Sequence, residues 1–187
     1  MSGVSSAVMI GGSGKSPRKK SDFYSTPPEC TEALMRAAGD LLPGRVWEPA
    51  CGTGAIAQVV KRFDREVVCT DLEDYGYGQG GIDFLTTTEA QGDCIITNPP
   101  FSLAAEFILK ARSFNQPVAM LLKSIYWHAS KRQKLFEQTG PSHILAMTWR
   151  PNFDPILGTS STMDFIWTIW GPEPAAVCQY RPIGRPV

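Results

Sequence analysis

The chain has 187 residues, of which 43% are hydrophobic, and this suits one globular domain with a full core. Its 18 basic and 18 acidic side chains balance, so the overall charge gives no sign of a nucleic-acid or membrane partner. The five widely spaced cysteines argue against a disulfide framework and a zinc site, and the absence of a long apolar run or a secretion signal predicts a cytoplasmic protein with no membrane span.

The predicted elements begin with a tail and a helix. Residues 1–20 are rich in glycine and serine and end in a basic cluster, so we expect a disordered basic tail. Thr26-Pro27-Pro28-Glu29 resembles a helix capping box with proline in the first turn, and apolar residues then recur at helical spacing. The pattern predicts a helix over 27–39 with Thr26 as its cap.

Strand-like runs then alternate with helical segments. Strands are predicted at 45–48, 66–72, 93–97 and 117–123, and helices at 55–63, 102–114 and 129–139. Two further strand-like runs, 142–149 and 162–170, have no helix between them. The alternation favours an α/β fold with a doubly wound, mostly parallel sheet, and the last two runs favour an antiparallel hairpin at one edge. We predict one domain over 21–175 and a C-terminal tail over 176–187, with Trp149, Trp167 and Trp170 packing the sheet.

A glycine-rich turn is predicted between the first strand and the helix after it. Gly52 and Gly54 belong to a Gly-x-Gly-x-x-Ala pattern, which permits a tight turn and lets a ligand approach the backbone beside a helix N-terminus. Asp71 ends the next strand, where a carboxylate can accept both hydroxyls of a ribose. Together they predict a site for a nucleoside-containing cofactor; the alternative is a tight turn with a surface acid nearby.

The acidic Glu48 distinguishes between two such cofactors. It stands at the end of the strand before the glycine turn, where it would repel the pyrophosphate of a nicotinamide dinucleotide. S-adenosylmethionine carries a sulfonium and an ammonium and no phosphate, so a carboxylate there helps its binding. Glu48 therefore favours the methyl donor.

The tetrapeptide Asn98-Pro99-Pro100-Phe101 directly follows the predicted strand 93–97. Two consecutive prolines fix their own φ angles, and the first keeps Asn98 out of the helical region. The Asn98 amide then points in one direction, with an aromatic ring three residues on. Such a loop suits a flat, amine-bearing group held against a ring, although Asn and Pro also form ordinary turns.

These motifs, in this order and at this spacing, resemble the amino-group DNA methyltransferases that modify adenine N6, in a compact form without a separate target-recognition domain. The resemblance spans about residues 22–170, since the segment 22–27 is similar to the family segment that closes over the methionine end of the cofactor. It implies a class I, Rossmann-like methyltransferase domain with a seven-stranded sheet, S-adenosylmethionine as cofactor with S-adenosylhomocysteine as product, and no metal.

The resemblance also implies roles for particular residues. Thr26 and Glu48 would lie near the methionine part of the cofactor, Asp71 would hold the ribose, and Asp83 would accept from the adenine amine with Phe84 against the ring. The other residues implied at the cofactor are Tyr24, Pro49, Ala50, Gly52, Gly54, Leu72 and Asn98.

The implied catalytic residues are Asn98, Pro99, Pro100 and Phe101. The side-chain oxygen of Asn98 and the carbonyl of Pro99 can accept the two hydrogens of the adenine amine and so localise its lone pair. Phe101 would stack on the target base, which must leave a duplex to reach the pocket. In the loop after the strand 117–123, Tyr126 or Trp127 is a candidate second ring near the base, with packing of the core as the alternative.

Other acceptors and other classes of function stay open. The same loop occurs in enzymes that methylate adenine in RNA or glutamine in proteins, and the chain could be a nonenzymatic module that binds DNA or senses the cofactor; a nicotinamide dehydrogenase ranks last. Only 17 residues follow Trp170, so we expect nucleic acid, preferably DNA, to be recognised by the tail, by the loops at 73–81, 124–132 and 150–161, or through a homodimer or a partner subunit. A bacterial or phage enzyme, of the kind found in restriction-modification, would fit this pattern.

Overall fold

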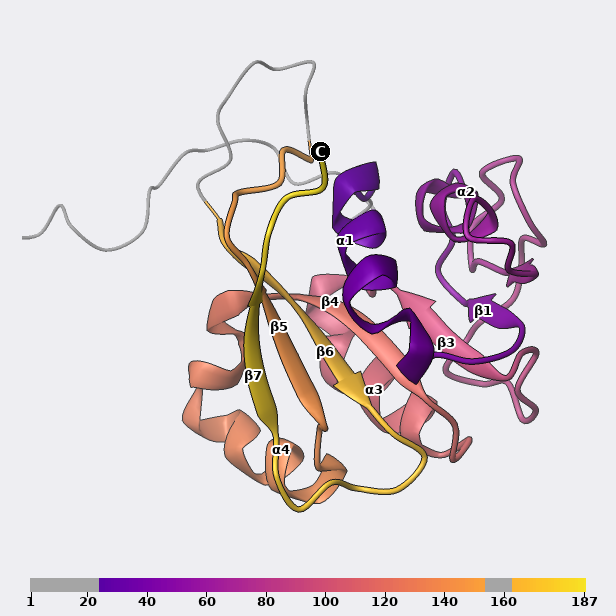
Figure 1. Cartoon of the computed structure of the whole chain (residues 1–187). Coiled ribbons are helices and arrows are strands. Elements are labelled where there is room, and N and C mark those ends of the chain that lie inside the picture. Colours follow the sequence, from indigo (N-terminus) through magenta and orange to yellow (C-terminus); the bar gives the residue numbers. More distant parts are fainter. Residues whose placement is uncertain (1–23, 154–162) are drawn as a thin grey trace, which may run out of the picture.

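The computed structural model describes residues 24–153 and 163–187, so the predicted basic tail and most of the loop 150–161 lie outside the described residues. A seven-stranded sheet forms the centre of the molecule, with the order β2-β1-β3-β4-β6-β5-β7 (Figure 1). The strands are β1 (Val46–Glu48), β2 (Val67–Cys69), β3 (Cys94–Thr97), β4 (Val118–Lys123), β5 (His143–Met147), β6 (Phe165–Trp170) and β7 (Gln179–Ile183). Strand β6 alone runs antiparallel to its neighbours. The predicted α/β fold with a mostly parallel, seven-stranded sheet is therefore confirmed.

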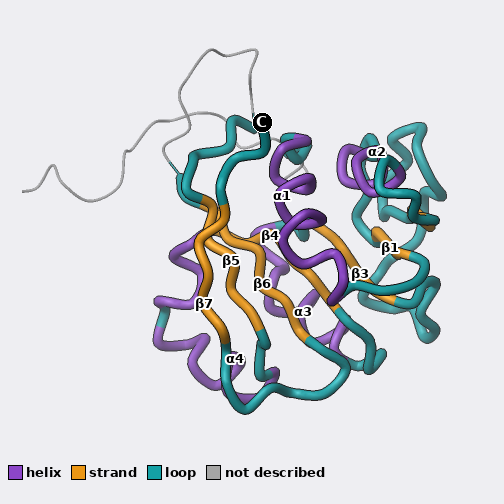
Figure 2. The backbone as a smooth tube through the Cα atoms, in the orientation of Figure 1, coloured by secondary structure: helices purple, strands orange, loops and turns teal. Residues whose placement is uncertain are grey.

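Helices cover both faces of this sheet. The α-helices are α1 (Pro28–Ala38), α2 (Ala55–Lys61), α3 (Ala104–Arg112) and α4 (Gln133–Thr139), and the short 3₁₀ helices are η1 (Gly39–Leu41), η2 (Phe101–Leu103), η3 (Ser124–His128) and η4 (Ser130–Arg132). In Figure 1, α1 lies in front of the sheet, and α3 and α4 lie behind it. The tube view in Figure 2 shows that loops make up much of the chain around β1 and α2.

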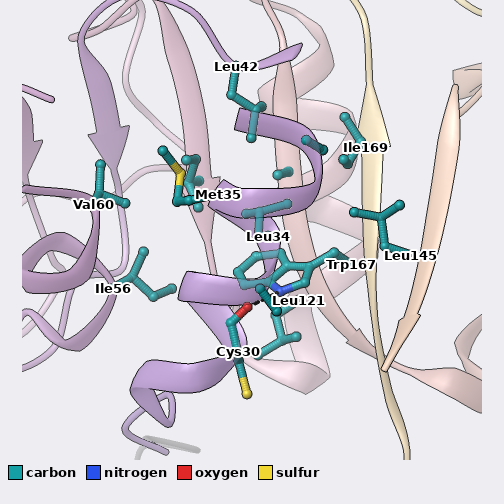
Figure 3. Close-up of a cluster of buried hydrophobic side chains, with 14 of the residues drawn as sticks. Cys30, Leu34, Met35, Leu42, Ile56, Val60, Leu121, Leu145, Trp167 and Ile169 are labelled. Atoms are coloured by element: carbon teal, nitrogen blue, oxygen red, sulfur yellow. Dashed lines mark hydrogen bonds between the residues drawn. The ribbon is translucent and has the colours of Figure 1, made fainter. Parts of the chain in front are cut away.

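Two apolar cores hold the layers together. On the α1 and α2 face, Leu34 and Ile56 pack against Trp167 and other sheet residues, and the Trp167 indole N–H donates to the Cys30 carbonyl at 2.9 Å (Figure 3). On the other face, Phe107 of α3 belongs to a core that includes β-strand side chains and Trp170. Alternate strand residues thus serve opposite cores, as period-two side-chain alternation requires.

The predicted elements agree with the structure except near their ends and in one strand. The predicted hairpin forms between β5 and β6, and the predicted packing role of Trp149, Trp167 and Trp170 is confirmed. The expected tail over 176–187 differs from the structure, because β7 pairs in parallel with β5 and Ile183 is buried. The β7 sequence Gln-Tyr-Arg-Pro-Ile has no apolar alternation, and its proline is tolerated because the strand lies at the sheet edge.

The predicted capping box is wrong. The N-cap of α1 is Pro27, and no side chain caps the helix. Thr26 is instead buried, and its hydroxyl bonds to another part of the chain, as described below.

Among residues 24–153 and 163–187, no helix is long and apolar enough to cross a membrane. All five cysteines lie in this part of the chain and are free thiols.

Candidate active site

A cavity lies at the carboxyl ends of the neighbouring parallel strands β1, β2 and β3, beside the segment that enters α1. This is where open α/β sheets bind ligands. Its volume is about 70 Å³, below the roughly 300 Å³ at the lower end of small-molecule sites. The predicted site residues that line it are Tyr24, Thr26, Glu48, Ala50, Asp71, Asn98, Pro99, Pro100 and Phe101.

The glycine turn connects β1 to α2 with two residues at positive φ. Gly52 has φ of 50° and Gly54 has φ of 80°. A Cβ at Gly54 would lie 2.2 Å from the Tyr77 ring, so the position needs glycine for two independent reasons. Tyr77 was not singled out from the sequence, since nothing local indicates that its loop folds back on this turn.

Asp71 joins the end of β2 to the glycine turn. Its Oδ2 accepts from the Gly52 backbone N–H at 2.8 Å, and its Oδ1 accepts from the Glu73 N–H at 3.0 Å. A carboxylate has about four acceptor positions, so two such bonds leave room for hydroxyl donors. The carboxylate is therefore held rigidly and can still bind a ribose.

Glu48 is a buried carboxyl in the wall of the cavity. Only 2% of the residue is exposed, and Oε2 accepts from the Ala57 backbone N–H at 3.0 Å. Burial raises the pKa of Glu48 well above its usual range, and the nearby Cys51 and Asp71 raise it further. A cation in the cavity would favour the ionised form and lower this pKa.

The Asn98 amide is fixed by the segment before α1. Its Nδ2 donates to Thr26 Oγ1 at 3.1 Å and to the Tyr24 carbonyl at 3.3 Å. Its Oδ1 is buried and has no hydrogen-bond partner. A buried acceptor without a donor costs about 1 to 3 kcal/mol, so this oxygen is available to an amine that enters the cavity.

The Phe101 ring lines the same cavity as Asn98. Tyr24 stacks beside it with ring centroids 6.0 Å apart and an interplanar angle of 28°. Lys123 at the end of β4 places its Nζ 4.5 Å from the Phe101 centroid. The ring is thus accompanied by a second aromatic residue and by a cation.

Six residues expected at the cofactor are not among those that line this cavity. Two of them, Gly52 and Gly54, form the turn beside it. Asp83 forms a local turn in which its Oδ1 accepts from the Leu85 N–H at 2.9 Å, and Leu72 is 61% exposed. Phe84 is 2% exposed, with its ring centroid 5.2 Å from that of Trp47, and therefore packs in the core. Pro49 is buried beside Glu48. Their roles at a cofactor stay predictions.

Tyr126 and Trp127 are placed mainly by packing. The Trp127 indole N–H donates to Thr168 Oγ1 at 3.1 Å, and its ring meets Phe136 and Trp170 edge-on. Tyr126 is 5% exposed, and the Arg132 guanidinium lies 3.8 Å from its ring centroid. The packing alternative describes Trp127, whereas Tyr126 borders a second cavity together with Phe101. The rings paired with Phe101 are those of Tyr24 and Phe165.

In the part of the chain that the structure describes, no group of three or more His, Cys, Asp or Glu side chains could hold a metal ion.

Solved structures share this architecture, although no protein-family model matches the chain and no curated protein matches it significantly in sequence. A proposed RNA methyltransferase from Pyrococcus horikoshii superposes with a TM-score of 0.66 at 19% identity, over 84% of this chain and 90% of that one. The chain has a Rossmann-like methyltransferase fold.

Two further neighbours are longer than this chain. The modification subunit of a proposed type I restriction enzyme from Vibrio vulnificus has a TM-score of 0.61 at 14% identity and covers 88% of this chain, which spans 48% of that subunit. A dimethyladenosine transferase from Plasmodium falciparum has a TM-score of 0.56 at 16% identity, over 81% of this chain and 63% of that one. At these identities the likeness concerns the fold.

Proposed function

We propose that this chain transfers a methyl group from S-adenosylmethionine to the N6 amine of adenine in DNA. The observation that carries the proposal is the unpartnered, buried Oδ1 of Asn98, a residue that lines the same cavity as Glu48 and Asp71. The fold neighbours that are named as methyltransferases support the reaction class.

The residues of the cavity suit the donor by charge and hydrogen bonding. Asp71 would accept from the ribose hydroxyls, and Glu48 would attract the cationic methionine end. The glycine turn would let the cofactor approach the backbone. When bound, the donor supplies an electrophilic methyl group on a sulfonium.

Asn98 and Pro99 would act on the acceptor amine. Their oxygens accept its two hydrogens, which draws the lone pair of N6 out of the ring and aims it at the methyl carbon. As the nitrogen–carbon bond forms and the carbon–sulfur bond breaks, N6 gains positive charge. The two oxygens stabilise that charge until one amine proton leaves to water. Preorganised dipoles of this kind typically contribute about 10²–10³ in rate.

Phe101 would hold the base by its flat face. Stacking on an aromatic side chain is worth about 1–3 kcal/mol per base, and Lys123 beside the ring adds a cation near the path of the phosphates. The sequence that begins at the end of β1 reads Glu-Pro-Ala-Cys, whereas glutamine methyltransferases typically have an Asp-Leu-Gly-Thr type of sequence there. This resemblance favours a nucleic acid over a protein glutamine as acceptor.

Adenine N6 in RNA is the second candidate acceptor. It is favoured by the likeness to the proposed RNA methyltransferase, of which this chain covers 90%. The modification-subunit neighbour belongs to an enzyme with further subunits, which supports a partner subunit or a second copy of this chain as a source of target recognition.

The test offers a methyl-labelled donor with duplex DNA, single-stranded DNA, RNA and protein, and then digests each labelled product to its modified unit. We expect N6-methyladenine in DNA from the wild type, and about 10²–10³-fold less of it from Asn98→Ala in the same time. Label on adenine in RNA and not in DNA would identify RNA as the acceptor, and label on glutamine would identify a protein as the acceptor. Donor binding without transfer to any acceptor would favour a cofactor-sensing module.

A further inference from the structure

The hydroxyl of Thr26 has a partner that its sequence position does not predict. It does not cap α1, whose N-cap is Pro27 without a side-chain bond. Thr26 is 4% exposed, and its Oγ1 accepts from Asn98 Nδ2 at 3.1 Å, across 72 positions in the chain. A buried hydroxyl is thus directed at the side chain that carries the proposed chemistry.

Both hydrogens of the Asn98 amide are donated to the segment before α1. One goes to Thr26 Oγ1, and the other goes to the Tyr24 carbonyl at 3.3 Å. The side chain therefore has only acceptor capacity left, on Oδ1, which has no partner. If the amide turned over, Oδ1 would face the Tyr24 carbonyl and the amide hydrogens would face the incoming amine.

We propose that Thr26 is a positioning residue that holds the Asn98 amide with its oxygen toward the acceptor amine. The inference rests on the proposed function. It assigns Thr26 an action through Asn98, in addition to its expected place near the methionine end of the cofactor. Donation of both amide hydrogens also polarises the carbonyl and strengthens Oδ1 as an acceptor.

Paired substitutions separate positioning from packing and from cofactor binding. Thr26→Val keeps the shape and removes the acceptor, whereas Thr26→Ser keeps the acceptor. We expect Thr26→Val to lower kcat by about 10- to 100-fold, as misplacement of a reacting group does, with KM and Kd for the donor within about 3-fold. Thr26→Ser should restore most of kcat.

Other patterns would overturn the inference. An equal loss in both variants would indicate packing, and a raised Kd for the donor with unchanged kcat would indicate a cofactor contact alone. A readout without turnover is the side-chain amide signal of Asn98 in a ¹⁵N-asparagine-labelled sample. Thr26→Val should shift it, and Thr26→Ser should shift it less. An unmoved signal counts against the contact even if the acceptor is not adenine.

A second cavity of about 390 Å³ lies on the other side of Phe101. It is bordered by η2, α3, the η3 and η4 turns and α4, and its lining includes Glu106, Leu109, Lys131 and Arg132. Phe101 is the residue that lines both cavities, so the second cavity borders the ring that is proposed to hold the target base.

The lining combines cations with apolar surface. Lys131 is exposed, and Arg132 is held in place because its Nη1 donates to the Tyr126 carbonyl at 2.7 Å and its guanidinium covers the Tyr126 ring. Leu109 is 45% exposed, and Glu106 is the acidic residue of the lining. From the size, the charge and the shared Phe101 ring we infer that this groove holds a nucleotide next to the target base, with its phosphate at Lys131 and Arg132. This inference also rests on a nucleic-acid acceptor.

Lysines on either side of the η4–α4 boundary provide a matched test. Lys131 lines the groove, and Lys134, which is also exposed, does not. With a fluorescent single-stranded oligodeoxynucleotide, Lys131→Ala should weaken binding several-fold and reduce the slope of log K against log salt by about 0.7. Lys134→Ala should change affinity less than 2-fold, and Glu106→Gln should tighten binding.

Equal effects of Lys131→Ala and Lys134→Ala would overturn the groove as a binding site. Equal oligonucleotide affinity of the wild type and all three variants would also overturn it. If methylation of nucleic acid is observed while these variants leave binding unchanged, the proposed function stands and the groove fails. If the wild type binds no oligonucleotide, the groove and the proposed nucleic-acid acceptor are both wrong. Methyl label on a protein in the acceptor assay would then identify the true acceptor.

Discussion

The half of the sheet that carries the candidate site differs from the half that closes the fold. Strands β2, β1 and β3 have three or four residues each, whereas β4, β6, β5 and β7 have five or six. In the first half, polar side chains accept from backbone N–H groups of the segment after β1, as Asp71 does from Gly52 in the glycine turn and Glu48 does from Ala57 in α2. In the second half, the long strands β4 and β6 are buried along almost their whole length and include Trp167, although the short strand β1 also buries Trp47.

This difference separates the sources of function and of stability. Short strands leave long connections at the carboxyl edge, and the hydrogen bonds that fix those connections also orient the groups of the cavity. Among the longer strands, β4 and β6 bury the most apolar surface, and such burial is the main favourable term in folding. Substitutions in the two halves should therefore affect different measurements.

The largest expected effect is on stability, at Trp167. The side chain is fully buried between α1 and the sheet, so Trp167→Ala should lower the free energy of unfolding by about 3–5 kcal/mol through lost burial and a cavity. Urea unfolding followed by circular dichroism measures it. Trp149→Ala, at a partly buried ring of the same core, should cost clearly less. A loss below about 1 kcal/mol at Trp167 would contradict the assignment of stability to this half.

The next effect is on turnover, at Asn98. Asn98→Ala should lower kcat by about 10²–10³, the range seen when one preorganised group at a developing charge is removed. The Kd of the donor, measured by calorimetry, should change by less than about 3-fold, and the unfolding midpoint should stay near that of the wild type. A kcat close to that of the wild type, or a clearly lower unfolding midpoint, would contradict the assignment of function to one half of the sheet and stability to the other.

The smallest effect is expected at Glu48. Glu48→Gln should weaken donor binding and stabilise the fold, which separates the function of this residue from its cost to stability. Burial raises the pKa of Glu48 in the folded protein. The folded state then holds the proton at pH values where the unfolded chain has released it, so this group's contribution to stability falls as pH rises above its ordinary value near 4.5. Glu48→Gln should remove this loss.

Two titrations measure the effect of Glu48→Gln. Urea unfolding between pH 5 and 8 should show a stability gain over the wild type that grows with pH. Calorimetry with the donor near neutral pH should show affinity about 10-fold weaker, since a charge partner for the cation is lost. A gain that is constant with pH would mean that Glu48 keeps its ordinary pKa, and unchanged affinity would place the cationic end of the donor elsewhere.

Most elements followed from local sequence signals. Apolar periodicity located α1 and α3, and the runs 94–97 and 118–122 are apolar because both faces of a central parallel strand are buried. The position of Asn98 directly after β3 and that of Glu48 at the end of β1 were also predicted from the chain. Since β1 and β3 are parallel neighbours, the two residues reach the same cavity.

Other features were missed because distant parts of the chain decide them. Strand β7 exists because β5 offers it an open edge, and nothing within residues 179–183 favours a strand. Phe84 lies in a core made by Trp47 and Phe107, so its sequence context, next to Asp83, does not place it at a ligand. Trp127 finds its indole partner on β6.

The sequence by itself determined the order of the strands and helices, the glycine turn and the rigid loop that begins at Asn98, since proline, glycine and apolar spacing act on the backbone over a few residues. Only the tertiary structure decided where the amide of Asn98 points. Thr26 carries a local capping signal, but its hydroxyl bonds to Asn98, because the packing of α1 on the sheet brings the two side chains together and a buried amide must satisfy its donors. The same packing leaves Oδ1 of Asn98 free to accept from a ligand.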